Sequence, residues 1–287
     1  MGFNSMDDLV SEISSGKYWR QDWNKITAAS AYTAGRWYCF SPLAGVPIAN
    51  TWTGTALNWQ STNDASGFSL YHGGAVTPDT KHVLNLSAIT AVATGVPGQL
   101  MLVDMQGYYP GISMNLATAQ TLVGTPTLRY ANGDGIKAYF VITTASGATA
   151  HNITMSYTNQ SGVAARTPPV TVSCTASAIA GHITHSGTAA NNYQFIPYAS
   201  GDRGIQSVQT VTVSAASGAG VAALVLCRPL LTIPLTVAGI ATERDMLNQI
   251  PALPQIKEGA CLTWLYFAGN ATAASTNFYG SIDFGWG

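Results

Sequence analysis

The sequence predicts an all-β protein of two tandem, jelly-roll-like β-sandwich domains that arose by internal duplication, with a short amphipathic helix at the N-terminus. Three observations support this. Short runs rich in β-branched and aromatic residues alternate with Gly, Pro, Asn and Ser turns. Hydrophobic residues make up 47% of the 287-residue chain and charged residues only 9%, against about 25% in a typical domain. Segments with similar patterns also recur about 124 positions apart.

The helix is expected over residues 5–15. Ser5 can cap its first turn, and Asp8, three residues later, completes a capping box. Gly16 is a suitable stop. An apolar stripe recurs at helical spacing through Met6, Leu9, Val10 and Ile13.

A segment rich in aromatic and charged residues follows, "KYWRQDWNK". We interpret residues 1–29 as an arm that docks on a partner. Its candidate docking residues are Met6, Leu9, Val10, Ile13, Tyr18, Trp19 and Trp23. The alternative is that the apolar stripe covers an open end of the chain's own first domain.

From residue 30 the chain is predicted to be β-structure. "LMLVDMQGYYPGI" (100–112) aligns with "LVLCRPLLTIPLT" (224–236), so that Pro110 matches Pro234. "GDGIKAYFV" (133–141) aligns with "KEGACLTWL" (257–265) at the same offset. Residues 117–126 and 242–251 also match, and both are expected to form a short helical turn. The predicted domains are therefore 30–160 and 161–287, with an immunoglobulin-like sandwich as the second choice of fold.

The composition argues against several functional classes. A net charge of −1 with scattered basic residues disfavours nucleic-acid binding. No apolar stretch approaches the roughly 20 residues of a membrane span. The four cysteines form no CxxC motif, so we expect free, buried thiols.

We find no catalytic, cofactor-binding or metal-binding motif, and we expect a protein that is not an enzyme. "YHGGAV" (71–76) resembles the oxyanion-hole run of some esterases but lacks a G-x-S-x-G partner. His182 and His185 lie in a β-like context, where a spacing of three places them on opposite faces.

The stretch "SAYTAGRWYCFSPLAGVPIANTW" (30–52), preceded by a short amphipathic helix, resembles virion structural proteins of tailed bacteriophages. These are head-associated or capsid-decorating proteins with β-sandwich domains. The resemblance implies a non-enzymatic role in the virion, after synthesis in the cytoplasm of a bacterial host. The implied partner is the major capsid protein or another virion protein.

The first functional hypothesis is therefore a capsid decoration, cement or minor head protein that binds the shell. We expect a homotrimer with contacts through residues 138–165 and 167–201, which contain no charged side chain. The alternative is a tail or surface adhesin that stacks host glycans on Trp52, Trp59, Tyr71 and Tyr193. A particle-borne hydrolase is the third possibility.

Overall fold

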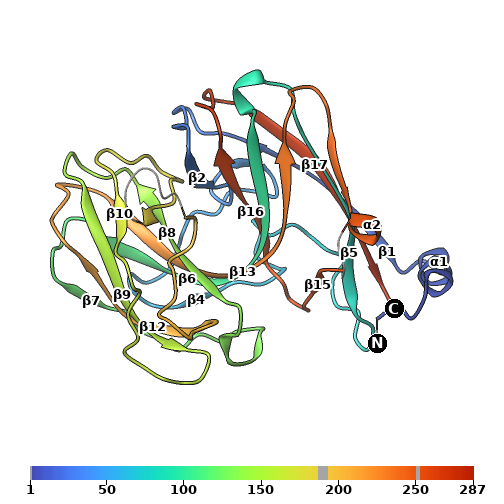
Figure 1. The fold of residues 1–287 in the computed structure, drawn as a ribbon, viewed down its shortest axis with the longest axis horizontal. Helices are drawn as coiled ribbons and strands as arrows, with labels where there is room; N and C mark the ends of the chain where they lie inside the picture. Colours follow the sequence, from blue (N-terminus) through green and yellow to red (C-terminus); the bar gives the residue numbers. More distant parts are fainter. Residues whose placement is uncertain (1, 187–192, 250–252) are drawn as a thin grey trace.

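The computed structural model describes residues 2–186, 193–249 and 253–287, and within them the chain forms three β-sheets (Figure 1). The terminal sheet, named for the chain ends beside it, has five strands in the order β14-β5-β17-β1-β3, and β15 also pairs with β5. Their bounds are β14 Thr242–Asp245, β5 Lys81–Thr90, β17 Asn277–Trp286, β1 Tyr18–Ile26, β3 Ala44–Val46 and β15 Gln255–Ile256.

The central sheet has the order β2-β16-β6-β13-β8, with β4 paired to the edge of β6. Its strands are β2 Arg36–Cys39, β16 Leu262–Ala268, β6 Gly98–Ser113, β13 Val221–Leu235, β8 Lys137–Thr144 and β4 Gln60–Ser61. The distal sheet has the order β11-β10-β9-β12-β7. Its strands are β11 His185–Ser186, β10 Val172–Cys174, β9 His151–Asn159, β12 Ile205–Val213 and β7 Ala119–Thr121.

Helical structure is limited to short segments in the described residues. They are α1 Met6–Ser14, α2 Met246–Gln249 and the 3-10 turns Ala93–Gly95 and Ala131–Gly133. The predicted N-terminal helix is confirmed, and the Ser5 hydroxyl accepts a hydrogen bond of 3.0 Å from the Asp8 amide. The helical turn expected at 117–126 is wrong, because this segment contains strand β7, which pairs with β12.

Two long strands, β6 and β13, run through the middle of the molecule as antiparallel neighbours. Leu100 pairs with Ile233, and Leu224 pairs with Tyr109. Leu224 lies 124 positions after Leu100, and Ile233 lies 124 positions after Tyr109. Each residue of one pair is therefore the repeat equivalent of a residue in the other pair. The two matched segments of the sequence are therefore partners in one sheet, related by an approximate twofold axis.

The same equivalence extends to the outer sheets. The order β14-β5-β17-β1-β3 of the terminal sheet matches β7-β12-β9-β10-β11 of the distal sheet, element for element. Each of these sheets combines strands from both parts of the chain, and they alternate except at the β1–β3 and β10–β11 edges. β1 pairs with β17, and β9 pairs with β12. Strands from residues 30–160 and strands from residues 161–287 therefore both occur in all three sheets.

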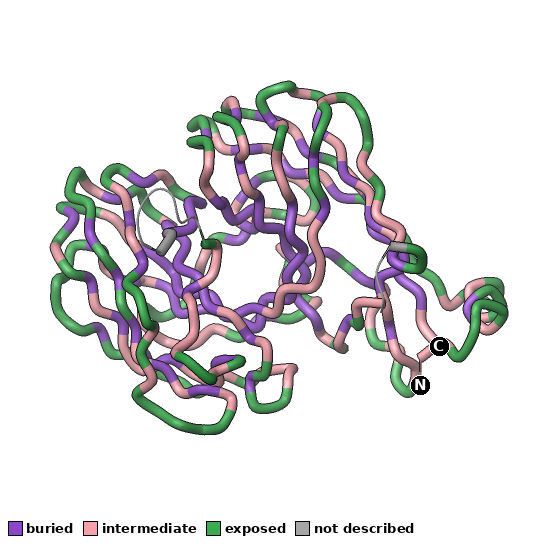
Figure 2. The backbone as a smooth tube through the Cα atoms, in the orientation of Figure 1, coloured by how far each residue is buried: buried purple, intermediate pink, exposed green. Residues whose placement is uncertain are grey.

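Two sandwich cores result. One lies between the terminal sheet and the central sheet and contains Trp23, Phe40 and Trp264, whereas the other lies under the distal sheet and contains Tyr109 and Phe140. Every residue from 100 to 110 is buried, as the middle of Figure 2 shows. The predicted all-β, sandwich-type fold with a short N-terminal helix is confirmed.

A third apolar cluster lies inside the curved central sheet. Bridges from Tyr38 to His182 and from Val141 to Ile183 join the two outer strands of this sheet and close it into a barrel-like ring. Three of the four cysteines, Cys39, Cys227 and Cys261, point into this cluster. All four thiols are free and buried, as expected from the sequence.

A buried ion pair stands where the two sandwiches meet. Asp104, in the middle of β6, is fully buried, and its carboxylate accepts hydrogen bonds from Arg129 at 2.5 and 3.2 Å. The Cys261 amide adds a third bond of 3.0 Å. Burial raises the pKa of Asp104, and the hydrogen bonds from Arg129 oppose that shift. Arg129 also donates to the backbone oxygens of Thr62 and Met105, so it joins three segments.

We predict that Arg129→Met lowers the free energy of unfolding by about 3 to 5 kcal/mol, because it leaves the Asp104 carboxylate buried without its partner. Denaturant unfolding at neutral pH measures this loss. The matched control is Arg203→Met, which removes an exposed pair with Asp134 at 3.5 Å and should cost less than about 1 kcal/mol. Equal losses in the two variants would contradict the role given to Arg129.

A second carboxylate, Asp202, anchors the distal sandwich. It accepts hydrogen bonds from Tyr157 at 2.7 Å, Asn159 at 2.7 Å and Arg166 at 2.9 Å. Burial favours the neutral acid, but the bonds from Arg166, Tyr157 and Asn159 outweigh it and lower the pKa of Asp202 to about 2.

Because this pKa is below the unfolded value of about 4, Asp202 contributes stability above pH 4 and loses it as the pH falls from about 4 to about 2. We predict that Asp202→Asn flattens the dependence of the unfolding midpoint on pH within that window. Asp134→Asn, at an exposed carboxylate, is the control and should keep the wild-type profile. An unchanged slope in Asp202→Asn would show that the acid loss arises elsewhere.

Candidate functional site: the terminal pole and the open strand edge

The first candidate site is the end of the molecule that carries α1 and both chain termini (Figure 1). We call this surface the terminal pole. It is defined by five residues with large, exposed apolar side chains: Met6, Val10, Tyr18, Trp19 and Tyr71. Met6 and Val10 are 57% and 58% exposed although both are apolar. Apolar side chains that gather in one exposed area are typical of an interaction surface.

Helix α1 is held on the terminal sheet by its other face. Leu9 is buried, and the Phe3 ring lies 5.8 Å from the ring of His82 on β5. Lys17, just after the helix, forms ion pairs with Glu12 at 2.9 Å and Asp79 at 2.8 Å. These contacts fix the orientation in which the helix presents Met6 and Val10 to solvent.

The aromatic part of the pole comes from the start of β1 and from the loop before β5. The Tyr18 hydroxyl donates to Asp283 at 2.6 Å, and burial, with this bond, raises the pKa of Tyr18 to about 12. Trp19 meets Tyr71 edge to face, with 5.3 Å between ring centroids. Both rings remain more than one-third exposed.

The structure separates the predicted docking residues into two groups. Trp23 does not dock on a partner: it is 3% exposed and packs against Trp264 at 4.9 Å in the first core. Leu9 is buried against the terminal sheet, as in the alternative interpretation, and Ile13 is half-buried. Strand β1 lies between β17 and β3, so residues 18–26 are an integral part of the fold. Sequence reasoning missed Tyr71 as a member of this surface, because only the fold brings it to Trp19.

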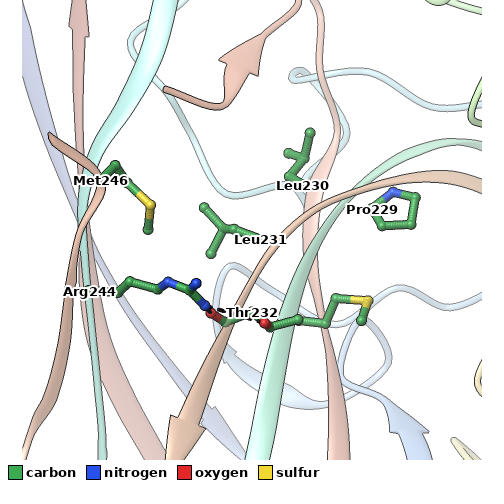
Figure 3. Close-up of a pocket in the computed structure, with 7 residues that line it drawn as sticks. Pro229, Leu230, Leu231, Thr232, Arg244 and Met246 are labelled. Atoms are coloured by element: carbon green, nitrogen blue, oxygen red, sulfur yellow. Dashed lines mark hydrogen bonds between the residues drawn. The ribbon is translucent and has the colours of Figure 1, made fainter. Parts of the chain in front are cut away.

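The second candidate site is a cavity of about 250 Å³ beside β13 (Figure 3). Strand β8 pairs with β13 only over Val221–Cys227, and among the described residues no strand pairs with the following half of β13 on that side, which we call its open edge. The Arg244 guanidinium donates to the Thr232 backbone oxygen, as the dashed line in Figure 3 shows. The lining residues are Met101, Pro229, Leu230, Leu231, Thr232, Arg244 and Met246.

The four aromatic residues considered for glycan binding each pack against a different neighbour. Trp52 meets Tyr108 at 5.1 Å, and Trp59 meets Tyr109 at 5.1 Å. Tyr108 and Tyr109 contribute to different apolar clusters. Tyr71 belongs to the terminal pole, and Tyr193 is 60% exposed beside Lys137. The fold therefore does not assemble these four side chains into one sugar-binding platform.

The described part of the chain contains no group of three or more His, Cys, Asp or Glu residues that could hold a metal ion. His182 lies against the ring of Tyr38, and the side chain of His185 lies outside the described residues. Burial raises the pKa of both Cys174 and Cys261 to about 12. No helix in the same residues is long and apolar enough to cross a membrane.

The chain matches no protein-family model and no curated protein sequence. Solved structures that match include the VP2 subviral particle of infectious bursal disease virus, with 10% identity and a TM-score of 0.23. That match covers 93% of this chain and 80% of the other. The Gx strain of the same virus matches with 11% identity and a TM-score of 0.21, over 94% and 81%.

We predict that Trp23→Ala lowers the free energy of unfolding by about 3 to 5 kcal/mol, because it opens a cavity in the first core. Trp19→Ala, four residues earlier on the same strand, should cost less because its ring is 38% exposed. Urea unfolding of the two variants makes the comparison. Similar costs would mean that Trp19 is as structural as Trp23, and would remove it from the docking surface.

Proposed function

We propose that this chain is a non-enzymatic structural protein of a virus particle. More specifically, we propose a capsid decoration or minor head protein of a tailed phage that binds the shell. The observation that carries the proposal is the terminal pole, the end of the molecule at which Met6 and Val10 are exposed on a fixed helix and the Trp19–Tyr71 pair is exposed beside the sheet. The resemblance of residues 30–52 to phage virion proteins supports the same assignment.

We also propose a homotrimer as the working unit. The low charge supports this, because Thr, Ser and Ala surfaces lose little electrostatic energy when subunits cover them. Not all of the uncharged stretches can contribute. Ala138–Ile142 is buried within the central sheet, whereas Val163 and Val170 in the distal part are 51% and 46% exposed. We therefore assign the subunit contacts to the exposed residues on either side of Arg166, whose own charge is paired with Asp202.

A glycan-binding adhesin is the second candidate, and the exposed edge-to-face pair of Trp19 and Tyr71 favours it. Aromatic faces of this kind also stack on sugars. The two functions differ in copy number. A decoration protein occurs in many copies, in a fixed ratio to the shell protein, whereas an adhesin occurs in few copies and binds glycans.

We predict that the double variant Met6→Glu, Val10→Glu folds normally but no longer cosediments with purified shells that lack this protein. Two carboxylates would have to be desolvated at the contact, and burial of an unpaired charge costs several kcal/mol. The shells come from the phage that encodes this chain. Cosedimentation and the melting temperature are both measured.

The control is Leu116→Glu, which places one charge at a 46% exposed apolar side chain of the distal sandwich. It should bind shells as the wild type does. Wild-type protein that fails to bind shells, or a double variant that binds as well as the wild type, would refute the proposed contact. Glycan binding by a chain present in few copies would favour the adhesin.

A further inference from the structure

The approximate twofold axis relates the cavity beside β13 to a filled position on the other side of the molecule. At the offset of 124 that relates β6 to β13, Tyr108 corresponds to Thr232, and Pro110 corresponds to Pro234. Leu122 directly follows β7, and Met246, which lines the cavity, directly follows β14, the matching strand of the terminal sheet; both side chains are buried. The same arrangement of a strand edge and a nearby buried side chain, which we call the frame, therefore occurs twice.

On the β6 side this frame holds an extended segment, residues 57–62. The Leu57 amide donates to the Pro110 oxygen at 2.7 Å, and Gln60 pairs with Tyr108 as part of β4. On its other side, the Trp59 amide donates to the Val123 oxygen at 2.9 Å. The segment thus lies between the edge of β6 and the residues after β7.

On the β13 side the corresponding position is the cavity of Figure 3. In that view Leu231 lies between Met246 on one side and Leu230 on the other. Pro234 keeps a backbone oxygen that matches the acceptor used by Leu57 at Pro110. Because proline has no amide hydrogen, Pro229 and Pro234 limit indiscriminate pairing along this edge. The edge is therefore open to a specific segment rather than to any strand.

The lining determines which side chain fits. On the filled side, position 107 is glycine, and a Cβ there would lie 2.4 Å from the Trp59 ring. The corresponding residue on the open side is Leu231, whose side chain lines the cavity. A tryptophan would therefore be too large, whereas an aliphatic side chain would fit. Arg244 is the one charged residue in the lining, and its guanidinium is bound to Thr232.

We propose that the open edge of β13 binds an extended, uncharged segment of another protein, which adds a strand beside Thr232 and inserts an aliphatic side chain among Leu230, Leu231 and Met246. This is strand addition at a sheet edge, in which backbone bonds give affinity and a pocket selects a side chain. Residues 57–62 already fill the equivalent position, and no other segment within the described residues pairs with the open edge, so we assign that edge to another polypeptide. The site is separate from the terminal pole.

The test uses the isolated full-length protein and a labelled peptide with the sequence of residues 55–62 carrying Trp59→Leu. We expect saturable binding in fluorescence anisotropy. The same peptide methylated on the backbone nitrogen of the residue that matches Leu57 cannot donate to Pro234, and should bind about tenfold more weakly. This comparison leaves the protein unchanged, so a folding defect cannot explain it.

Two protein variants complete the test. Leu230→Asp places a carboxylate in the cavity and should weaken peptide binding by about tenfold or more. Ile240→Asp is the matched control, because its side chain is 62% exposed and does not line the cavity, and binding should not change. Melting temperatures of both variants are recorded.

Absence of saturable binding, or equal affinities for the methylated and unmethylated peptides, would overturn the proposal. A wild-type dimer that the peptide dissociates would identify the occupant as a second copy of this chain, and would overturn the assignment to another protein. No shell is present in these experiments. A negative result in these peptide experiments therefore does not contradict the proposed shell binding through the terminal pole. A failure of shell binding likewise does not contradict peptide binding at β13.

Discussion

The antiparallel pairing of β6 with β13 is the constraint on which the rest of the structure depends. Each strand is long enough to contribute one half to each sandwich, so neither core is complete without both. Register is strongly specified there, because a slip by one residue would exchange the side chains of two apolar faces. The Asp104–Arg129 pair lies in the same region and ties β6 to the segments around it.

Exchange of strands between the two halves follows from this arrangement. The terminal sheet needs β1 from the start of the chain and β17 from its end, and the distal sheet likewise places β12 between β9 and β7. Most of the contacts that hold the sheets together therefore join residues far apart in sequence. Such a topology favours cooperative stability of the whole chain over independent stability of either half, and slow folding is its usual consequence.

The two candidate sites lie where the approximate twofold symmetry is broken. Helix α1 adds an exposed apolar surface at the pole of the terminal sheet. The segment that contains β4 fills one strand edge of the central sheet, while no strand of the described residues pairs with the related edge of β13. A duplicated frame provides two similar positions, and the segment that contains β4 occupies only one of them. Functional specialisation of the second position is then possible without disturbing the core.

The sequence by itself determined the all-β class, the N-terminal helix with its Ser5 cap, the free thiols and the 124-residue repeat. These depend on local patterns, namely side-chain periodicity, capping and spacing along the chain. Only the tertiary structure decided that the repeats exchange strands, that Trp23 belongs to a core and that Tyr71 meets Trp19. The local sequence does not distinguish an aromatic residue whose ring is buried from one whose ring is exposed. Which strand edge stays open likewise depends on pairing between distant segments, and local patterns do not encode that pairing.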